Sequence, residues 1–142
     1  MHKFGFPLKI QNDWPPVSVE WLWFVPTADG MKLQSCPLFV SELSVGDEII
    51  VELDEDSCVR KWHHRERSHR STVWVLRVSS TADPAHLAPL RELACNTSWS
   101  SQVGVASVDV PPEVDISRFD EVIESLRSSG WAIAYPSWRL EE

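Results

Sequence analysis

The residues best suited to chemistry gather in one short segment, residues 60–70 (RKWHHRERSHR). The segment holds five of the thirteen Lys and Arg residues and three of the five His residues. Cations beside an aromatic ring suit a phosphate or RNA contact, with Trp62 as the platform on which a base stacks. That hypothesis assigns the contact to Arg60, Lys61, Trp62, Arg65, Arg67 and Arg70. Two other interpretations stay open: a solvated strand and loop that pairs with nearby acids, or a partner-binding loop.

The histidines and cysteines form no pattern that is typical of a metal site or an activated nucleophile. His63 and His64 are adjacent, so on a strand they point to opposite faces and cannot easily share one ion. Zinc requires four converging N or S ligands, or three and a water, and the nearest thiol is Cys58. The sequence has no G-x-S-x-G motif and no glycine-rich phosphate loop. We therefore expect no catalytic residue, no metal and no cofactor.

Two other features favour a protein partner. An acidic cluster lies at a predicted hairpin tip, and the chain has a net charge of -8, which favours basic partners. Two tryptophans flank prolines near the ends of the chain, where burial is harder, and Trp is a common interface anchor. An alternative is that these two tryptophans cover the seam between two halves of the protein. The predicted partner-binding residues are Trp14, Asp54, Glu55, Asp56 and Trp138.

Length, cysteine spacing and hydropathy limit the class of protein. The chain has 142 residues, 43% of them hydrophobic and 24% charged, which is a typical globular mixture. The three cysteines lie far apart, which argues against a disulfide framework. The sequence contains neither a signal-peptide pattern nor an apolar run near the roughly 18 residues of a membrane span. These features predict a soluble cytoplasmic protein without a membrane partner.

The elements that must position these residues fall into two parts, which predict an α+β fold. Residues 1–16 are expected to form an arm that ends in two prolines. Residues 17–70 contain four or five short strands separated by turns, which predicts a small antiparallel sheet or barrel. In its first strand, residues 17–25, alternation places Trp21 and Trp23 on one face, and we expect that face to be in the core.

Residues 71–142 show a different pattern, in which strands alternate with helices. Amphipathic spacing and a capping aspartate predict a helix over about 116–129, and Asp83-Pro84 predicts an earlier helix start. Interior Pro89 predicts that the earlier helix starts late or is kinked. The order β-α-β-β-α-β predicts a ferredoxin-like sandwich. The expected strands are residues 72–78, 96–100, 103–110 and 131–138.

Five short stretches between residues 15 and 115 resemble a family of small bacterial proteins known as domain of unknown function 4265. They are residues 15–23 (PPVSVEWLW), 37–40 (PLFV), 43–47 (LSVGD), 71–72 (ST) and 108–115 (VDVPPEVD). The architecture that the resemblance implies agrees with the one above, and the family offers no established activity to carry over. Family members often have a Gly and an Asn or His before the Ser-Thr pair. Because His69 and Arg70 stand there in this chain, the resemblance implies a differently built turn.

These observations lead to three hypotheses about function. The first is a non-catalytic acidic binding protein, in its most concrete form an immunity protein that neutralises a basic bacterial toxin domain. The second is RNA or phosphate binding through residues 60–70, which the negative net charge disfavours. The third is an enzyme whose site has no recognisable motif, and such a site would require a cleft with converging ionisable groups.

Overall fold

The computed structural model describes residues 1–140. The chain forms two compact units, and the boundary between them lies between Ser68 and His69. The first unit consists of strands, and the second combines strands with helices. Both sheets are antiparallel, so the expected α+β class is confirmed. Within the described residues, neither helix has the length and apolar character needed to cross a membrane.

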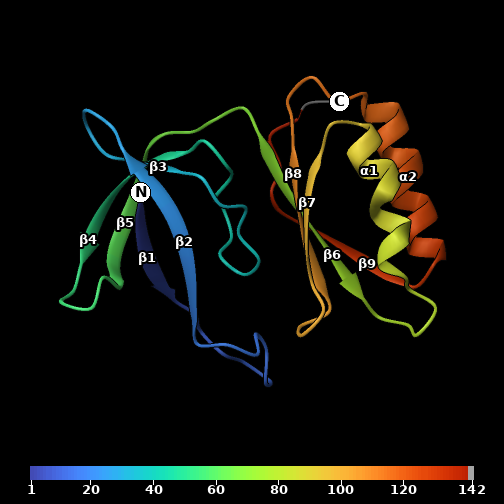
Figure 1. Cartoon of the computed structure of the whole chain (residues 1–142), viewed down its shortest axis with the longest axis horizontal. Helices are drawn as coiled ribbons and strands as arrows, with labels where there is room; N and C mark the ends of the chain where they lie inside the picture. Colours follow the sequence, from blue (N-terminus) through green and yellow to red (C-terminus); the bar gives the residue numbers. More distant parts are fainter. Residues whose placement is uncertain (141–142) are drawn as a thin grey trace. The chain divides into compact units, whose positions relative to one another are not determined.

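The first unit is a five-stranded antiparallel sheet in which neighbouring strands follow one another along the chain (Figure 1). The predicted small antiparallel sheet is thereby confirmed, but the sheet does not close into a barrel. Its edge strand β1 meets the start of the other edge strand, β5, at an isolated bridge, where the Gly5 N–H donates to the Ser57 carbonyl at 3.0 Å. The strands are β1 (His2–Pro7), β2 (Val19–Pro26), β3 (Met31–Leu33), β4 (Glu48–Leu53) and β5 (Val59–Glu66).

Strand β1 replaces the first half of the arm that the sequence predicts over residues 1–16. It pairs with β2 along its whole length, from His2 opposite Phe24 to Pro7 opposite Val19. Alternation within the strand is the physical reason, because Phe4 and Phe6 point inward and are buried. The apolar face of β1 is only two phenylalanines wide, which left too weak a signal in the sequence.

The buried face of β2 is the opposite of the one that the sequence predicts. Leu22 and Phe24 are buried, whereas Trp21 and Trp23 are each 43% exposed. Alternation shows which residues share a face, but both faces of this strand carry large apolar side chains, so it does not show which face is covered. The core beneath β2 also contains Phe4, Phe6, Leu33, Val40, Leu43, Ile49 and Val59.

The second unit is a four-stranded sheet with both helices on one of its faces (Figure 1). The strand order is β7-β8-β6-β9, and every neighbouring pair is antiparallel. A 3-10 turn, η1 (Pro84–Leu87), leads into a short helix, α1 (Ala88–Glu92), and this break is where Pro89 predicted a late start. The other elements are β6 (Ser71–Arg77), β7 (Asn96–Ser100), β8 (Val105–Val110), α2 (Ile116–Ser128) and β9 (Trp131–Ser137).

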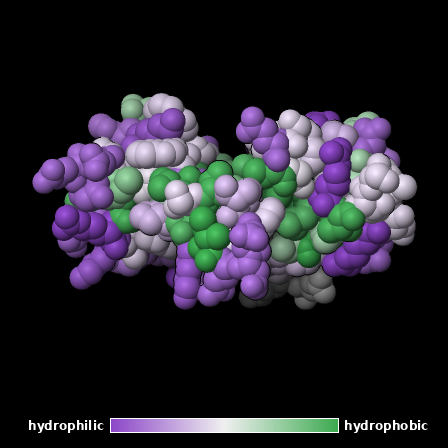
Figure 2. Space-filling model, turned by 90° about the horizontal axis from the view of Figure 1, so that it is seen from below, coloured by the Kyte–Doolittle hydropathy of each residue, from purple (hydrophilic) through white to green (hydrophobic). Residues whose placement is uncertain are grey.

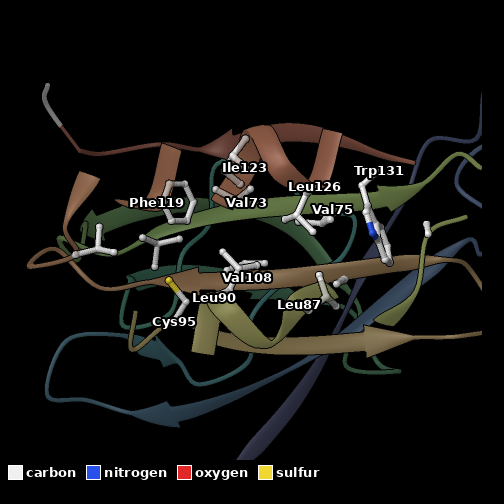
Figure 3. Packing of buried hydrophobic residues seen from close by; sticks show 14 residues of the cluster. Val73, Val75, Leu87, Leu90, Cys95, Val108, Phe119, Ile123, Leu126 and Trp131 are labelled. Atoms are coloured by element: carbon white, nitrogen blue, oxygen red, sulfur yellow. The ribbon is translucent and has the colours of Figure 1, made fainter. Parts of the chain in front are cut away.

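Helix α2 begins and ends where the sequence places it. The Asp115 carboxylate accepts the Arg118 N–H at 3.2 Å and caps the first turn, and Gly130 follows the last turn at φ +96°. Its buried face packs on the sheet together with residues of η1 and α1 (Figure 3). The labelled core side chains are Val73, Val75, Leu87, Leu90, Cys95, Val108, Phe119, Ile123, Leu126 and Trp131.

Candidate functional site

The outer face of the first unit's sheet carries two exposed tryptophans from one strand. Trp21 and Trp23 alternate with buried residues on β2, so both rings project from the same face. On the neighbouring strand β1, Gly5 stands opposite Trp21 and Lys3 stands opposite Trp23. We call Lys3, Trp21 and Trp23 the tryptophan face. Exposed apolar side chains among hydrophilic ones are also visible on the side of the molecule drawn in Figure 2.

Gly5 makes room for the ring of Trp21. A Cβ atom at position 5 would lie 3.0 Å from the ring of Trp21 and 2.9 Å from a methyl group of Val19. The Trp21 ring therefore lies against the backbone of β1, a position that any other residue at 5 would obstruct. The Lys3 ammonium lies 5.9 Å from the Trp21 ring centroid and 5.5 Å from the Trp23 centroid, within the range of a cation–π contact.

The acidic turn, residues 54–57, adjoins β1. Asp54 shapes it, because its Oδ1 accepts the N–H groups of Asp56 at 2.8 Å and Cys58 at 3.0 Å. Glu55 and Asp56 remain exposed at its tip. Because the Ser57 carbonyl accepts the Gly5 N–H, the turn lies along the edge of β1 at the residue that stands opposite Trp21. The predicted residues Asp54, Glu55 and Asp56 thus belong to a turn on one edge of β1, and the two tryptophans that sequence reasoning assigned to the core belong to the strand on its other edge.

The nearby thiol of Cys58 is held in its protonated form. Partial burial raises the pKa of this thiol, and the negative charges of Asp54 and Asp56 raise it further. A thiol in such surroundings is a poor nucleophile at neutral pH. The acidic turn therefore offers carboxylates and no reactive sulfur.

The residues that the RNA hypothesis assigns to the basic segment do not all point to the same side. On β5, Trp62 points inward and packs edge-on against Phe6 at a centroid distance of 6.3 Å, whereas Lys61 and Arg65 point outward. The predicted stacking platform is thus on the opposite side of the strand from these cations. The Arg65 guanidinium is also engaged, at 2.9 Å from Asp29 and 2.8 Å from Glu48.

Arg70 belongs to the second unit and forms an ion pair with Asp109 of the same unit. Its Nε donates to the Asp109 carboxylate at 2.7 Å, and this hydrogen bond raises the pKa of the guanidinium. Arg60 and Arg67, the remaining predicted contacts, are exposed in the first unit. Of the six residues of the RNA hypothesis, Trp62 therefore points inward and Arg65 and Arg70 pair with acidic side chains. The other three, Arg60, Lys61 and Arg67, are exposed.

Trp14 and Trp138 each pack on an aromatic neighbour within their own unit. Trp14 is 45% exposed and meets Phe39 edge-on, with ring centroids 5.8 Å apart. Trp138 is half-buried, 5.7 Å from Phe119 and 5.2 Å from Tyr135. Trp14 thus remains an exposed aromatic of the first unit, and Trp138 is largely part of the packing of the second.

A buried carboxylate, Glu20, serves to hold a loop. Its two oxygens accept the backbone N–H groups of Leu38 at 2.6 Å, Phe39 at 2.9 Å and Val40 at 2.9 Å. Burial raises the pKa of the Glu20 carboxyl, and the three donors offset part of that rise. This contact joins two of the stretches that carried the family resemblance, residues 15–23 and 37–40.

Asp47 plays the same part for the next stretch, residues 43–47. Its carboxylate is fully buried and accepts the N–H of Ser44 at 3.0 Å and that of Ser68 at 2.8 Å. It also contacts His64 Nε2 at 2.9 Å. Together with Asp109 and Glu20, it makes three buried acids in family-like stretches, each bound by groups of its own unit.

The described residues offer little that resembles a reactive centre. No group of three or more His, Cys, Asp or Glu side chains in residues 1–140 is placed to hold a metal ion. Burial raises the pKa of the Cys95 thiol to about 11, and the Asp109 charge adds to the effect. A cavity of about 390 Å³ lies between η1, α1 and α2, with His86 and Glu121 among its lining residues. His86 Nδ1 accepts the N–H groups of Trp131 and Asp83, both at 3.2 Å, so the ring carries its hydrogen on Nε2.

Comparison with known proteins gives a family and a fold. A family model described as a domain of unknown function, DUF4265, matches residues 20–134. A crystal structure of a hypothetical protein from Neisseria gonorrhoeae has a TM-score of 0.75 and 17% sequence identity, and the match covers 95% of this chain and 93% of that one. No curated protein matches the chain. At that identity the likeness concerns the fold alone.

Proposed function

The chain belongs to the family described as domain of unknown function DUF4265, and we propose that it is a non-catalytic protein that binds a basic protein partner. The tryptophan face is the contact surface, and the partner also contacts Glu55 and Asp56, which are exposed in the turn at the other edge of β1. The observation that carries this proposal is the exposure of Trp21 and Trp23 side by side on β2, each at 43%.

Two exposed tryptophans side by side on one strand favour a binding role. Burying both rings inside a partner would remove a large apolar area from water, and Trp is among the residues that dominate binding energy at interfaces. The Gly5 position supports this view, since it keeps the Trp21 ring against the sheet and so pre-arranges the surface. Contact with a basic partner follows from the neighbouring carboxylates and from the net charge of -8.

The non-catalytic part of the proposal rests on how the ionisable groups are used. Glu20, Asp47 and Asp109 are buried, yet each accepts hydrogen bonds that hold loops or strands. The thiols of Cys58 and Cys95 have raised pKa values and are poor nucleophiles. The raised pKa values of Glu20, Cys58 and Cys95 therefore accompany structural roles, and structural networks are a common cause of such perturbation.

The same proposal includes the finer fold and the biological setting. The strand order β7-β8-β6-β9 and the element order of the second unit support a ferredoxin-like arrangement. Three free cysteines favour a reducing compartment such as the cytoplasm. In the concrete version, the partner is a basic toxin domain encoded beside this chain, which acts as the immunity protein.

Co-purification tests the proposal. The tagged chain is expressed together with the product of the neighbouring gene, and the complex is isolated by affinity and gel filtration. We expect the wild type to retain a basic partner and the Trp21→Ser/Trp23→Ser variant to lose it. Tyr135→Ser, which removes a ring of similar exposure (42%) from the second unit, is the matched control and should retain the partner. Equal retention by all three proteins, or by none, counts against the proposal.

A further inference from the structure

The tryptophan face already holds one cation, which comes from the chain itself. Lys3 Nζ lies within 6 Å of both ring centroids, at 5.9 Å from Trp21 and 5.5 Å from Trp23. Pairing of β1 with β2 fixes this placement, because Lys3 stands directly opposite Trp23 in the register. The two rings thus form a site that is attractive to a cation, and a flexible lysine on an edge strand occupies it.

An arginine suits this site better than the lysine does. A guanidinium is planar, stacks on aromatic rings and is more weakly hydrated than an ammonium, so less hydration is lost when it binds. The second unit contains such a contact, because the Arg77 guanidinium carbon lies 4.9 Å from the Trp99 centroid and 6.0 Å from that of Trp131. Arg77 therefore approaches one ring of its pair more closely than Lys3 approaches either ring.

The neighbouring acidic turn supplies the charge that an incoming cation needs. Lys3 itself brings one positive charge to the surface, whereas Glu55 and Asp56 are exposed at the turn that binds Gly5. Carboxylates pair with a guanidinium through its several N–H donors, and such bonds are stronger than those between neutral groups. Since the turn and β2 flank the same strand, a segment that crosses β1 can stack one arginine on the rings and pair another cation with the turn.

From these contacts we infer that the tryptophan face binds an arginine side chain of the partner and that Lys3 is an internal competitor for the same site. This inference rests on the proposed function and adds the chemical group that is recognised. Binding requires the arginine to displace the Lys3 ammonium from Trp21 and Trp23. Removal of the Lys3 charge therefore strengthens binding by more than the general effect of losing one positive charge.

Peptide titration followed by tryptophan fluorescence and calorimetry tests the inference with the full chain. The probes are hexa-arginine and hexa-lysine, which carry equal charge. We expect wild type to bind hexa-arginine at least about threefold more tightly, since a cation–π contact at an exposed site contributes about 0.5–1 kcal/mol. Trp21→Ser should abolish the difference between the two peptides.

A pair of lysine substitutions separates competition from overall charge. Lys3→Met should tighten hexa-arginine binding about three- to tenfold, whereas Lys9→Met, which removes the same charge from the loop between β1 and β2, should tighten it less than twofold. Circular dichroism confirms that each variant is folded. Equal affinities for the two peptides, or equal effects of Lys3→Met and Lys9→Met, would overturn the inference. The proposed function still stands in that case if the product of the neighbouring gene co-purifies with wild type and not with the Trp21→Ser/Trp23→Ser variant.

Discussion

Gly5 and Trp21 are directly opposed across β1 and β2, and the tryptophan ring occupies the place where a side chain at position 5 would begin. A Cβ atom there would lie 3.0 Å from the ring, closer than ordinary van der Waals contact allows. The absence of a side chain on the neighbouring strand therefore leaves the room that the exposed tryptophan ring occupies.

Gly5→Ala should displace the Trp21 ring. We expect the free energy of unfolding to fall by about 1–3 kcal/mol, the usual range for added atoms in a packed place, and the tryptophan emission to shift. Urea unfolding and fluorescence spectra measure the two effects. In a Trp21→Ser background the same substitution should cost less, because Val19 is then the remaining obstacle. An equal cost in both backgrounds would show that the ring does not lie over Gly5.

Glu20→Gln should destabilise the first unit. An amide cannot accept N–H donors at both of its ends, so the N–H of Leu38 or those of Phe39 and Val40 lose their acceptor. We expect a loss of about 1–3 kcal/mol, measured by urea unfolding. Glu52→Gln, at an exposed position of β4, is the control and should change little. A neutral Glu20→Gln would mean that the loop at residues 38–40 does not depend on this carboxylate.

The pH dependence of unfolding should carry the sign of the Glu20 shift. Burial raises the pKa of Glu20 in the folded chain, so the folded state binds more protons than the unfolded state between the two pKa values. The stability linked to Glu20 is fully present below the ordinary glutamate pKa and is lost as pH rises through the raised value. The advantage of wild type over Glu20→Gln should therefore shrink with rising pH across this window, in urea titrations at successive pH values. An advantage that grows with pH would contradict the direction of the shift.

Two aspartates should differ sharply in their contribution to stability. Asp47 is fully buried and accepts from Ser44, Ser68 and His64, so Asp47→Asn should lower the free energy of unfolding by about 1–3 kcal/mol. Asp29 pairs with Arg65 at the surface, and Asp29→Asn should cost less than about 1 kcal/mol, as is usual for exposed ion pairs. Thermal unfolding of the two variants provides the comparison. Similar losses would show that burial does not determine the role of Asp47.

Thiol labelling should distinguish Cys95 from Cys36. Cys95 is buried and its pKa is raised to about 11, so it should resist an aromatic disulfide reagent at pH 8 in the folded protein. Cys36 is partly exposed and should react first. Cys95→Ser should leave the native labelling curve unchanged and remove one thiol after unfolding. Rapid native labelling that disappears in Cys95→Ser would contradict the assigned burial.

Local signals were sufficient to predict much of the second unit. Asp115 and Gly130 bracket α2, and its apolar spacing matches the face that packs on the sheet. Pro89 marks the break between η1 and α1, because an interior proline removes a helical hydrogen bond. These features depend on neighbours within a few residues, which is why the sequence alone reveals them.

The first unit was harder to predict because its decisive contacts join distant residues. Glutamate is a residue type that is usually found at the surface. The Glu20 carboxylate can be buried because it accepts hydrogen bonds from backbone N–H groups almost twenty residues away. With Glu20 inside, Trp21 and Trp23 face outward, which alternation alone could not decide. The acidic turn was identified from its charge, whereas its place beside β1 required the bridge at Gly5. Gly5 is consistent with an outward-facing Trp21 ring, but this becomes apparent only when the pairing of β1 with β2 places the two residues opposite each other.

The proposed role of the tryptophan face can be measured as the dissociation constant of the complex with the basic protein that we propose is encoded beside this chain. Calorimetry compares wild type, Trp21→Ser/Trp23→Ser and Tyr135→Ser at one salt concentration. We predict that the double substitution weakens binding at least about thirtyfold, since interface tryptophans commonly contribute about 2 kcal/mol or more, while Tyr135→Ser leaves the constant unchanged. A double variant that stays folded and binds as tightly as wild type would contradict it.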